Sequence, residues 1–433
     1  MDYAEIKING KFIRLPLIKG SDGKQAIDIR FFNQENNITT FDTALNSTSI
    51  AKSQISYIDS KNGKLYYRGY DVEELVEKST FVEVAFLLIY GHLPTKEEMK
   101  KFSLELSKHS MIHESMRLFF DAFPGTAHPL AILATLVTAL SAYYPLSFEE
   151  NMKKGIDIRI RLLAKVRTLA AWAYKKSVGQ PIIYPRDELP YCTNFLNMMF
   201  ATPAEPYQVD PIDDRILNQV LILYADHEMN ATTTTVRIVA SGRANLFACI
   251  NAGICSLWGS RESDANVPPI VMLEEMINKN LTPEVYFRDF LYGKRQLKLN
   301  SLGHPAYETE DPRARVSRRL FKDYYQLKLQ KDPTIANDPI IKKALEVEDY
   351  VSNHPLFKEM NLYLNVEFYS ALIFKLLGIP PKMNNVIRTI GKLPGWLAHW
   401  SEQREDPDRK SYRPRQVYVG NLNKKYIPID ERT

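Results

Sequence analysis

Two segments of the chain contain residue types that could carry out chemistry on a small acid. "YADHEMN" places His227 between Asp226 and Glu228, and a histidine beside carboxylates can be a metal ligand or a general base. From this segment alone, a capping cluster at a helix start is the stronger interpretation. "GHPAYETEDPRARV" places His304 nine residues before Arg313. This pair suits an anionic substrate, because Arg can hold a carboxylate by two hydrogen bonds while His donates to a carbonyl; a charged surface turn is an equally good interpretation.

Two later segments offer a carboxylate and more arginines. "NVEFYSALIF" places Glu367 at the start of an apolar helix, where it is either a favourable charge on the helix dipole or a general base. "SYRPRQ" places Arg413 and Arg415 on either side of a rigid proline, an arrangement suited to carboxylates. The sequence contains no glycine-rich phosphate loop, zinc-ligand spacing or serine nucleophile motif. We therefore predict a site for a small anion without a metal ion or bound cofactor.

A fifth segment, "SLWGSRESDAN", changes abruptly from apolar to charged. The apolar run from Leu246 to Trp258 stops at Gly259, and Arg261, Glu262 and Asp264 follow. A buried element that ends on so many charges raises the question of what Glu262 does close behind a tryptophan.

The composition limits the classes of protein that the chain can be. Its 433 residues exceed what one hydrophobic core usually serves, so we expect two or three domains. The 56 basic and 51 acidic residues give a net charge of +5, which argues against a nucleic-acid-binding protein and allows small anionic ligands. The most apolar segment, residues 129–144, is shorter than the ~20 residues that a membrane-spanning helix needs. The first residues lack the pattern of a signal peptide, so we expect a cytoplasmic protein that contacts no membrane.

The hydrophobic pattern predicts a mainly α protein with a small β portion at its start. The first fifty residues contain short β-rich pieces, and "YIDSKNGKLYYRG" predicts a hairpin turning at "KNG". From Val72 onward, apolar residues recur at helical spacing. "GIPPKM" must end a helix, because two prolines cannot continue one. Besides those before residue 129, we expect helices over residues 129–144, 156–178, 211–240, 243–258, 267–279, 312–330, 338–349, 363–377 and 384–404.

In order and spacing, these segments resemble the citrate synthase family over nearly the whole chain. The resemblance is carried by "YIDSKNGKLYYRGYDVEEL", "GQPIIYPRDELPYCTNFLNMMF", "YADHEMNATTTTVRIVASGRANLFACINAGICSLWG", "GHPAYETEDPRA", "NVEFYS" and "GWLAHWSEQ". It implies an N-terminal β subdomain over residues 1–50, a large helical domain over 51–266 and 379–433, and a small helical domain over 267–378. The active site would lie between the two helical domains. The length and the β segment look like the longer bacterial class, which implies a homodimer, or a hexamer regulated by NADH.

The resemblance also implies roles for single residues. His304 would polarise the ketone of oxaloacetate, and His227, Arg313 and Arg413 would bind the substrate. Glu367 stands where the family has an aspartate as general base.

Two further positions and one loop depart from the family. Glu262 stands where the family has a catalytic histidine that hydrogen-bonds the thioester oxygen of acetyl-CoA. Lys392 stands where an arginine holds a carboxylate of the substrate. The loop after His304 reads Pro305, Ala306 and Glu308 where the family usually has basic residues that serve CoA, so an acyl-CoA is a co-substrate only on the strength of the resemblance.

These departures leave three hypotheses about function. The first is a citrate synthase-like enzyme that binds oxaloacetate or a related oxoacid or tricarboxylate and has altered C–C bond chemistry, with Glu262, His304 and Glu367 as catalytic residues. The second is a catalytically silent ligand-binding or scaffold protein, and the third is a slow ordinary citrate synthase. Retention of Arg313 and Arg413 disfavours a pure scaffold.

A second site follows from the same resemblance. Lys108, His109, Met111, Arg161 and Lys165 resemble the NADH pocket of the allosteric class, although Lys108 replaces the usual arginine. Basic residues on solvated helix faces are an equally good interpretation.

Overall fold

The computed structural model describes residues 2–205, 207–259, 269–292 and 301–432. The residues group into two units, Met1–Lys52 with Tyr412–Thr433, and Ser53–Ser411. Residues 412–433, which the sequence analysis places with the large helical domain, thus group with the N-terminal residues. The division of residues 53–411 into a large and a small domain stays a prediction.

The first unit contains an antiparallel sheet of strands β1 (Tyr3–Ile8), β2 (Lys11–Lys19) and β3 (Gln25–Ile27), followed by the short helix α1 (Phe32–Asn36). Ile8 pairs with Lys11, so the turn between the first two strands consists of Asn9 and Gly10. Both have positive φ, 49° and 80°, as a two-residue hairpin turn of this type requires. The predicted β portion at the start of the chain is therefore present.

The second unit begins with the predicted hairpin. Strand β4 (Ser56–Asp59) pairs with β5 (Lys64–Tyr67), and β5 pairs with β6 (Tyr70–Asp71). Tyr67 at the end of β5 is fully buried, and its hydroxyl donates to the carbonyl oxygen of Asp226 at 2.9 Å. This hydrogen bond ties the hairpin to the segment that carries His227.

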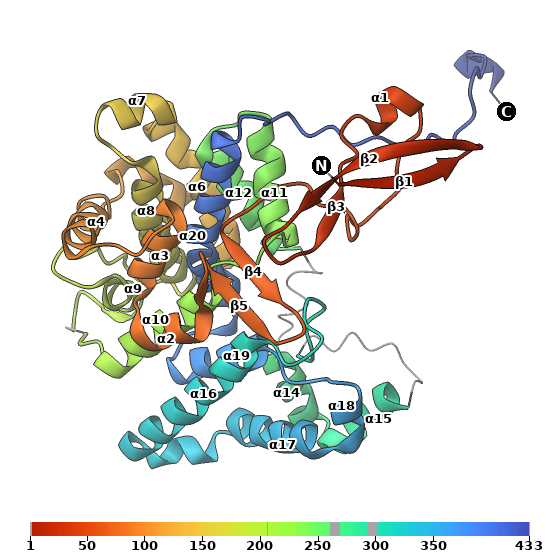
Figure 1. The fold of residues 1–433 in the computed structure, drawn as a ribbon. Helices are drawn as coiled ribbons and strands as arrows, with labels where there is room; N and C mark the ends of the chain where they lie inside the picture. Colours follow the sequence, from red (N-terminus) through yellow and green to blue (C-terminus); the bar gives the residue numbers. More distant parts are fainter. Residues whose placement is uncertain (1, 206, 260–268, 293–300, 433) are drawn as a thin grey trace. The chain divides into compact units, whose positions relative to one another are not determined.

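The rest of the second unit is helical, which confirms the mainly α prediction (Figure 1). Thr95 and Glu98 form the capping box of α4, in which each side chain accepts a hydrogen bond from the backbone amide of the other residue. The helices are α2 (Val72–Lys78), α3 (Phe81–Tyr90), α4 (Lys96–Lys108), α5 (Arg117–Ala122), α6 (Pro129–Tyr143), α7 (Phe148–Lys153), α8 (Ile158–Ser177), α9 (Tyr191–Phe200), α10 (Pro211–Tyr224), α11 (Ala231–Ser241), α12 (Leu246–Leu257), α14 (Pro269–Asn278), α15 (Pro283–Leu291), α16 (Pro312–Lys331), α17 (Pro339–Asn353), α18 (Pro355–Glu359), α19 (Val366–Leu376) and α20 (Asn384–Glu405). None of the described helices is both long enough and apolar enough to span a bilayer.

One predicted helix is wrong. Residues 211–240 form two helices, α10 and α11, because the chain leaves the helical path at residues 225–230. Glu228 has a positive φ of 50°, and the side chain of Asn230 accepts a hydrogen bond from the amide of Thr233 to start α11. The cluster of Asp226, His227 and Glu228, which has the character of a helix start, was the available sign of this break in the sequence. We call residues 225–230 the His227 loop.

Helix α20 is largely buried and packs against α3, α8, α10, α11 and α12. Two glycines let it approach the end of α10 closely. The amide of Gly395 donates to the carbonyl oxygen of Ala225 at 3.1 Å, and a Cβ at Gly395 would lie 2.3 Å from that oxygen. A Cβ at Gly391 would lie 2.7 Å from the Cβ of Tyr224. Only residues without a side chain fit at these two points.

Replacing Gly395 with alanine should destabilise the protein, because the added methyl group collides with backbone that cannot move freely. We expect Gly395→Ala to lower the free energy of unfolding by about 1–3 kcal/mol, the usual effect of overpacking, as measured by urea denaturation. Gly125→Ala is the matched control, since a Cβ there meets nothing within 4 Å. Equal stability of the two variants would contradict the packing described for α20.

Candidate active site

Two histidines and an arginine from separate segments meet at one place in the second unit. His227 lies in the His227 loop, His304 lies in the loop before α16, and Arg313 lies in the first turn of α16. The centroids of the two imidazole rings are 4.6 Å apart, at an interplanar angle of 73°. The structure thus brings together three of the predicted substrate-binding and catalytic residues.

The protonation state of His304 suits donation to a carbonyl. Its Nδ1 accepts a hydrogen bond from the amide of Ala306 at 3.2 Å, so Nε2 carries the ring proton. Burial, and then the charge of Arg313, lower the pKa of His304 to about 4. The pKa of His227 is also well below its usual value, for the same two reasons. At neutral pH both rings are therefore uncharged, and His304 presents an N–H group.

Arg313 is held in place by Asp311, the N-cap residue of α16. Arg313 donates from Nε to Oδ1 at 3.2 Å and from Nη2 to Oδ2 at 2.7 Å, and both side chains are buried. Burial by itself would lower the pKa of Arg313, but the charge of Asp311 and its hydrogen bonds outweigh it and raise the pKa. The guanidinium is thus permanently charged, with its plane fixed by the aspartate.

The same cluster has the composition of a metal site, but its electrostatics favour an anion. One ligand atom from each of His227, His304 and Asp311 lies within 4.8 Å of the others. However, both oxygens of Asp311 already accept from Arg313. The charges of Arg313 and Lys392 also lower the pKa of both histidines, so the potential here disfavours added positive charge. A carboxylate is the better ligand for this arrangement.

The candidate base Glu367 and the candidate ligand Lys392 lie in the same neighbourhood. Glu367 is in the first turn of α19, where Asn365 caps the helix by accepting from the amide of Phe368. The carboxylate of Glu367 acts on the pKa of His304 against the effect of Lys392, so both charges are within electrostatic reach of that ring. Glu367 and Lys392 are each 7% exposed.

Glu367 also forms a buried ion pair that the sequence analysis missed. Nη2 of Arg388 lies 3.3 Å from Oε1 of Glu367, and the two side chains are 7% and 8% exposed. Arg388 precedes Lys392 by one turn of α20, so both project from the same face of the helix. A charged residue at this spacing within an apolar helix was the available signal.

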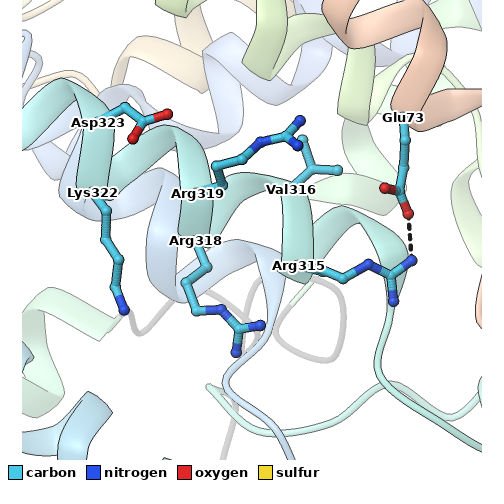
Figure 2. Close-up of a pocket in the computed structure, with 7 residues that line it drawn as sticks. All are labelled: Glu73, Arg315, Val316, Arg318, Arg319, Lys322 and Asp323. Carbon is cyan, nitrogen blue, oxygen red and sulfur yellow. Dashed lines mark hydrogen bonds and ion pairs between the residues drawn. The ribbon is translucent and has the colours of Figure 1, made fainter.

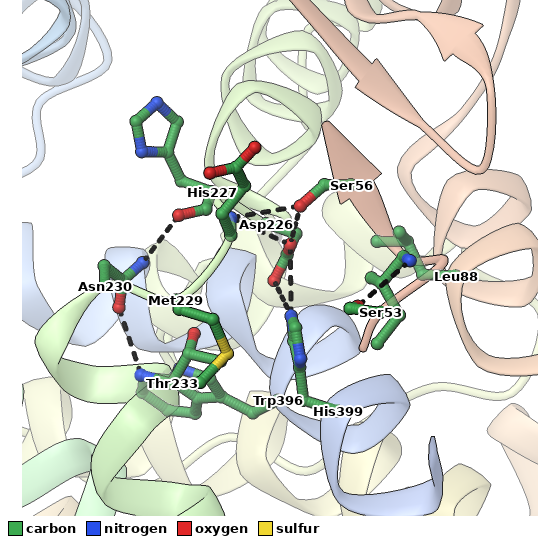
Figure 3. Close-up of polar contacts among 12 residues, drawn as sticks. Ser53, Ser56, Leu88, Asp226, His227, Met229, Asn230, Thr233, Trp396 and His399 are labelled. Carbon is green, nitrogen blue, oxygen red and sulfur yellow. Dashed lines mark hydrogen bonds and ion pairs between the residues drawn. The ribbon is translucent and has the colours of Figure 1, made fainter. Parts of the chain in front are cut away.

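The His227 loop is fixed by a chain of buried polar contacts (Figure 3). The carboxylate of Asp226 accepts from the hydroxyl of Ser56 and from Nε2 of His399, the latter at 3.3 Å. Burial by itself would raise the pKa of Asp226, but the contacts with His399 and Ser56 lower it. The amide of Glu228 donates to the Ser56 hydroxyl at 3.0 Å, so both sides of His227 are anchored.

The tautomer of His399 follows from its second neighbour. Nη1 of Arg237 lies 3.2 Å from Nδ1 of His399, and a guanidinium can only donate, so Nδ1 accepts and Nε2 carries the proton. Arg237 in turn pairs with Glu402 at 3.0 Å. Ser56, Arg237 and His399 were not predicted, because their role depends on contacts between residues more than 150 positions apart.

The described structure does not test the remaining predicted residues of this site. Glu262 lies in residues 260–268, outside the described residues. Arg413 belongs to the first unit, where it is exposed. The roles of both residues stay predictions.

The five residues predicted to form an NADH pocket are partly brought together. Arg161 and Lys165 lie over the ring of Tyr144, at 4.4 and 5.1 Å from its centroid, and Lys165 donates to the carbonyl oxygen of Met111. Burial, and then the charge of Arg161, lower the pKa of Lys165 to about 8. The pKa of His109 is lowered by burial and then by Arg161.

Lys108 differs from the other members of this group. Its ammonium pairs with Glu105 at 2.9 Å, and its side chain is 55% exposed. We call His109, Arg161 and Lys165 the basic cluster.

Two hollows are candidates for a bound ligand. The hollow in Figure 2, about 340 Å³ in volume, is lined by basic residues of α16. Arg315 and Arg319 there pair with Glu73 and Glu77 of α2, so the cations already have carboxylate partners. The other hollow, about 490 Å³, is lined by His304, Tyr307 and Asp311 and therefore opens directly on the candidate site.

Comparisons with known proteins agree with this fold. The family model described as "Citrate synthase, C-terminal domain" matches residues 44–415. The chain is 41% identical to citrate synthase 1 of Mycobacterium tuberculosis H37Rv over 436 residues, covering 100% of this chain and 99% of that protein. The chain therefore belongs to the citrate synthase family.

Solved structures give the same result. The citrate synthase of Pyrobaculum aerophilum is 30% identical with a TM-score of 0.77, and the match covers 100% of both chains. The Thermoplasma acidophilum citrate synthase, solved as a ternary complex with carboxymethyl coenzyme A and oxaloacetate, is 26% identical. Its TM-score is 0.77, with 90% of this chain and 98% of that chain covered. The protein is thus a citrate synthase-like enzyme with a mainly α fold.

The lowered pKa of His304 should make stability depend on pH. As the pH falls, His304 takes up a proton near pH 6.5 in the unfolded chain but only near pH 4 in the folded chain. Proton binding therefore stabilises the unfolded state first. The stability linked to His304 is fully present above pH 6.5 and is lost towards pH 4, by up to about 3 kcal/mol. Urea denaturation across this range should show a smaller loss for His304→Gln than for the wild type; parallel curves would contradict the assignment.

Proposed function

We propose that the protein binds oxaloacetate, or a related oxoacid or tricarboxylate, at His227, His304 and Arg313, and carries out altered C–C bond chemistry of the citrate synthase type. The observation that carries this proposal is the neutral His304, whose Nε2 carries the ring proton and whose pKa is lowered by burial and by the nearby fixed guanidinium of Arg313. One group suits a ketone oxygen and the other a carboxylate, which are the two functions of a 2-oxoacid.

Each of the other charged residues has a role in this scheme. Lys392 and Arg413 would bind the remaining carboxylates of the substrate, as the family resemblance implies for these positions. Glu367 would remove a proton from the second substrate, and the carbanion so formed would attack the ketone held by His304. An acyl-CoA is the second substrate by analogy with the carboxymethyl coenzyme A in the Thermoplasma complex.

Glu262 is the reason to propose altered chemistry. An ionised carboxylate cannot donate to the oxygen of a developing enolate, and loss of one such donor typically costs about 10²–10³ in rate. Two negative charges about 4 Å apart also repel by ~4 kcal/mol at a surface-like dielectric. A protonated Glu262 could replace the missing donor, as a carboxyl group beside other carboxylates can retain its proton.

An ordinary citrate synthase activity is the second candidate. It is favoured by the 41% identity to a protein named citrate synthase 1, which extends over the whole chain. A catalytically silent protein that keeps the oxoacid site is the third, and it shares the ligand-binding residues with the other two.

Restoring the family residue at position 262 should separate these candidates. We expect the wild type to release thiol from acetyl-CoA and oxaloacetate at least about 10²-fold more slowly than Glu262→His. Both proteins should be stabilised by oxaloacetate in a thermal shift assay. Glu262→Gln is the control, because it removes the charge without supplying an imidazole.

The alternative outcomes identify the other candidates. Fast thiol release by the wild type, unchanged or slowed by Glu262→His, would establish an ordinary citrate synthase. Oxoacid binding without thiol release in either protein, with any acyl-CoA, would favour a silent protein. The absence of any stabilisation by oxoacids or tricarboxylates would contradict the oxoacid site itself.

We propose that the basic cluster binds NADH as a regulatory ligand and that the protein is a homodimer or a hexamer. The support for the ligand is the close grouping of Arg161 and Lys165 around Tyr144. Light scattering should give two or six times the chain mass of 49.9 kDa.

Binding of NADH should depend on the charge of Lys165. Since the pKa of Lys165 is about 8, the affinity should fall as the pH rises through 8. Lys165→Gln should lose about 1.5–3 kcal/mol of binding free energy, as for a charge-assisted hydrogen bond, in calorimetric titration. Lys108→Gln is the control on an exposed lysine of the same region. No heat of binding for the wild type with NADH would contradict the proposal.

A further inference from the structure

We infer that Arg388 is a positioning residue that holds the Glu367 carboxylate and balances its charge, so that the site can accept an anionic oxoacid beside a second carboxylate. This inference rests on the proposed function, since it concerns the same site. It names a residue that neither the motifs nor the family resemblance pointed to.

Contacts from three helices define the position of this pair. Oε1 of Glu367 on α19 lies 3.3 Å from Nη2 of Arg388 on α20, and both side chains are withdrawn from water. The guanidinium of Arg388 lies over the ring of Tyr224 on α10, at 5.6 Å from its centroid. The Tyr224 hydroxyl and the Ser370 hydroxyl are 2.5 Å apart, and Ser370 donates to the carbonyl oxygen of Glu367 at 3.3 Å. The first turn of α19 is thus anchored to the same tyrosine that packs on the arginine.

The length of Glu367 fits this contact. A glutamate carries its carboxylate one methylene further from the backbone than the aspartate of the family. Here the carboxylate is in contact with Arg388, which Glu367 reaches across the interface of α19 and α20. The longer acid and the buried arginine therefore form one unit, and its charge is balanced within the protein.

The charge of Glu367 must be balanced because it acts on the residues of the proposed substrate site. The negative charge of Glu367 affects the pKa values of His304, Arg313 and Tyr224, so its electrostatic effect extends over the candidate site. A carboxylate that is not compensated would repel a dianionic substrate and compete with it for Arg313. Two internal pairs, Arg313 with Asp311 and Arg388 with Glu367, keep the sum of these four charges at zero.

A double-mutant cycle on ligand binding tests the inference without depending on turnover. Isothermal titration with oxaloacetate and with citrate is performed on the wild type, Arg388→Gln, Glu367→Gln and the double variant. Arg388→Gln should weaken binding by about tenfold or more, because one negative charge at the site becomes uncompensated. The double variant should return to within about threefold of the wild type, since removal of Glu367 removes the repulsion. Arg388→Lys should bind nearly as well as the wild type, because it retains the charge.

Lys375→Gln is the matched control. Lys375 is also part of an ion pair made by α19, with Asp338 at 2.8 Å, but that pair is partly exposed. Loss of this cation should leave the affinities unchanged. If the single variant Arg388→Gln does not fold, Glu367→Gln is compared with the wild type instead. Glu367→Gln should bind both acids about threefold or more tightly than the wild type. The reason is that the positive charge of Arg388 is then no longer balanced by Glu367.

The results that overturn the inference differ from those that overturn the proposed function. Wild-type affinity in Arg388→Gln would overturn it, as would a double variant no better than Arg388→Gln, which would indicate a purely structural arginine. If the wild type binds neither oxaloacetate nor citrate, the proposed oxoacid site is contradicted. The inference about Arg388 is then contradicted as well.

Discussion

The close approach of α20 to the end of α10 is the contact on which the candidate site depends. Gly391 and Gly395 remove the side chains that would keep the two helices apart, and the Gly395 amide then donates to Ala225. Because the helix comes so near, Lys392 and Arg388 reach the substrate site, and His399 reaches Asp226. A wider spacing would separate the two histidines from Lys392, one of the cations that lower their pKa values.

Charge inside this region is arranged in pairs and short chains. Arg313 with Asp311 and Arg388 with Glu367 are both buried, and the chain from Glu402 to Asp226 alternates acceptors and donors. Breaking a buried pair is costly because the remaining charge has no compensation, so each residue constrains its partner. Such an arrangement fixes side chains within a small distance of each other, which is what a site needs in order to discriminate between acids of similar size.

Much of the fold and part of the site could be predicted from the sequence. Apolar periodicity located most helices, and "KNG" located the hairpin, because both signals are local. The resemblance brought His227, His304 and Arg313 into one prediction, and the structure places them together. The break at residues 225–230 was missed although Asn230 caps α11 locally, and its conformation is also held by distant residues such as Tyr67. Arg388 was missed for a similar reason, since nothing next to it in the sequence indicates that Glu367 is its partner.

The chain of contacts around Asp226 has a consequence for the order in which the protein can be made. Ser56, Asp226 and His399 are separated by 170 and 173 positions, and the amide of Gln54 donates to Glu402, 348 positions later. During synthesis, a ribosome must therefore finish α20 before the His227 loop can take its final form. Until then the faces of α3, α10 and α11 that receive α20 lie uncovered, and apolar surface of this kind promotes aggregation. Assembly of the candidate site is in this sense one of the last events in the folding of the chain.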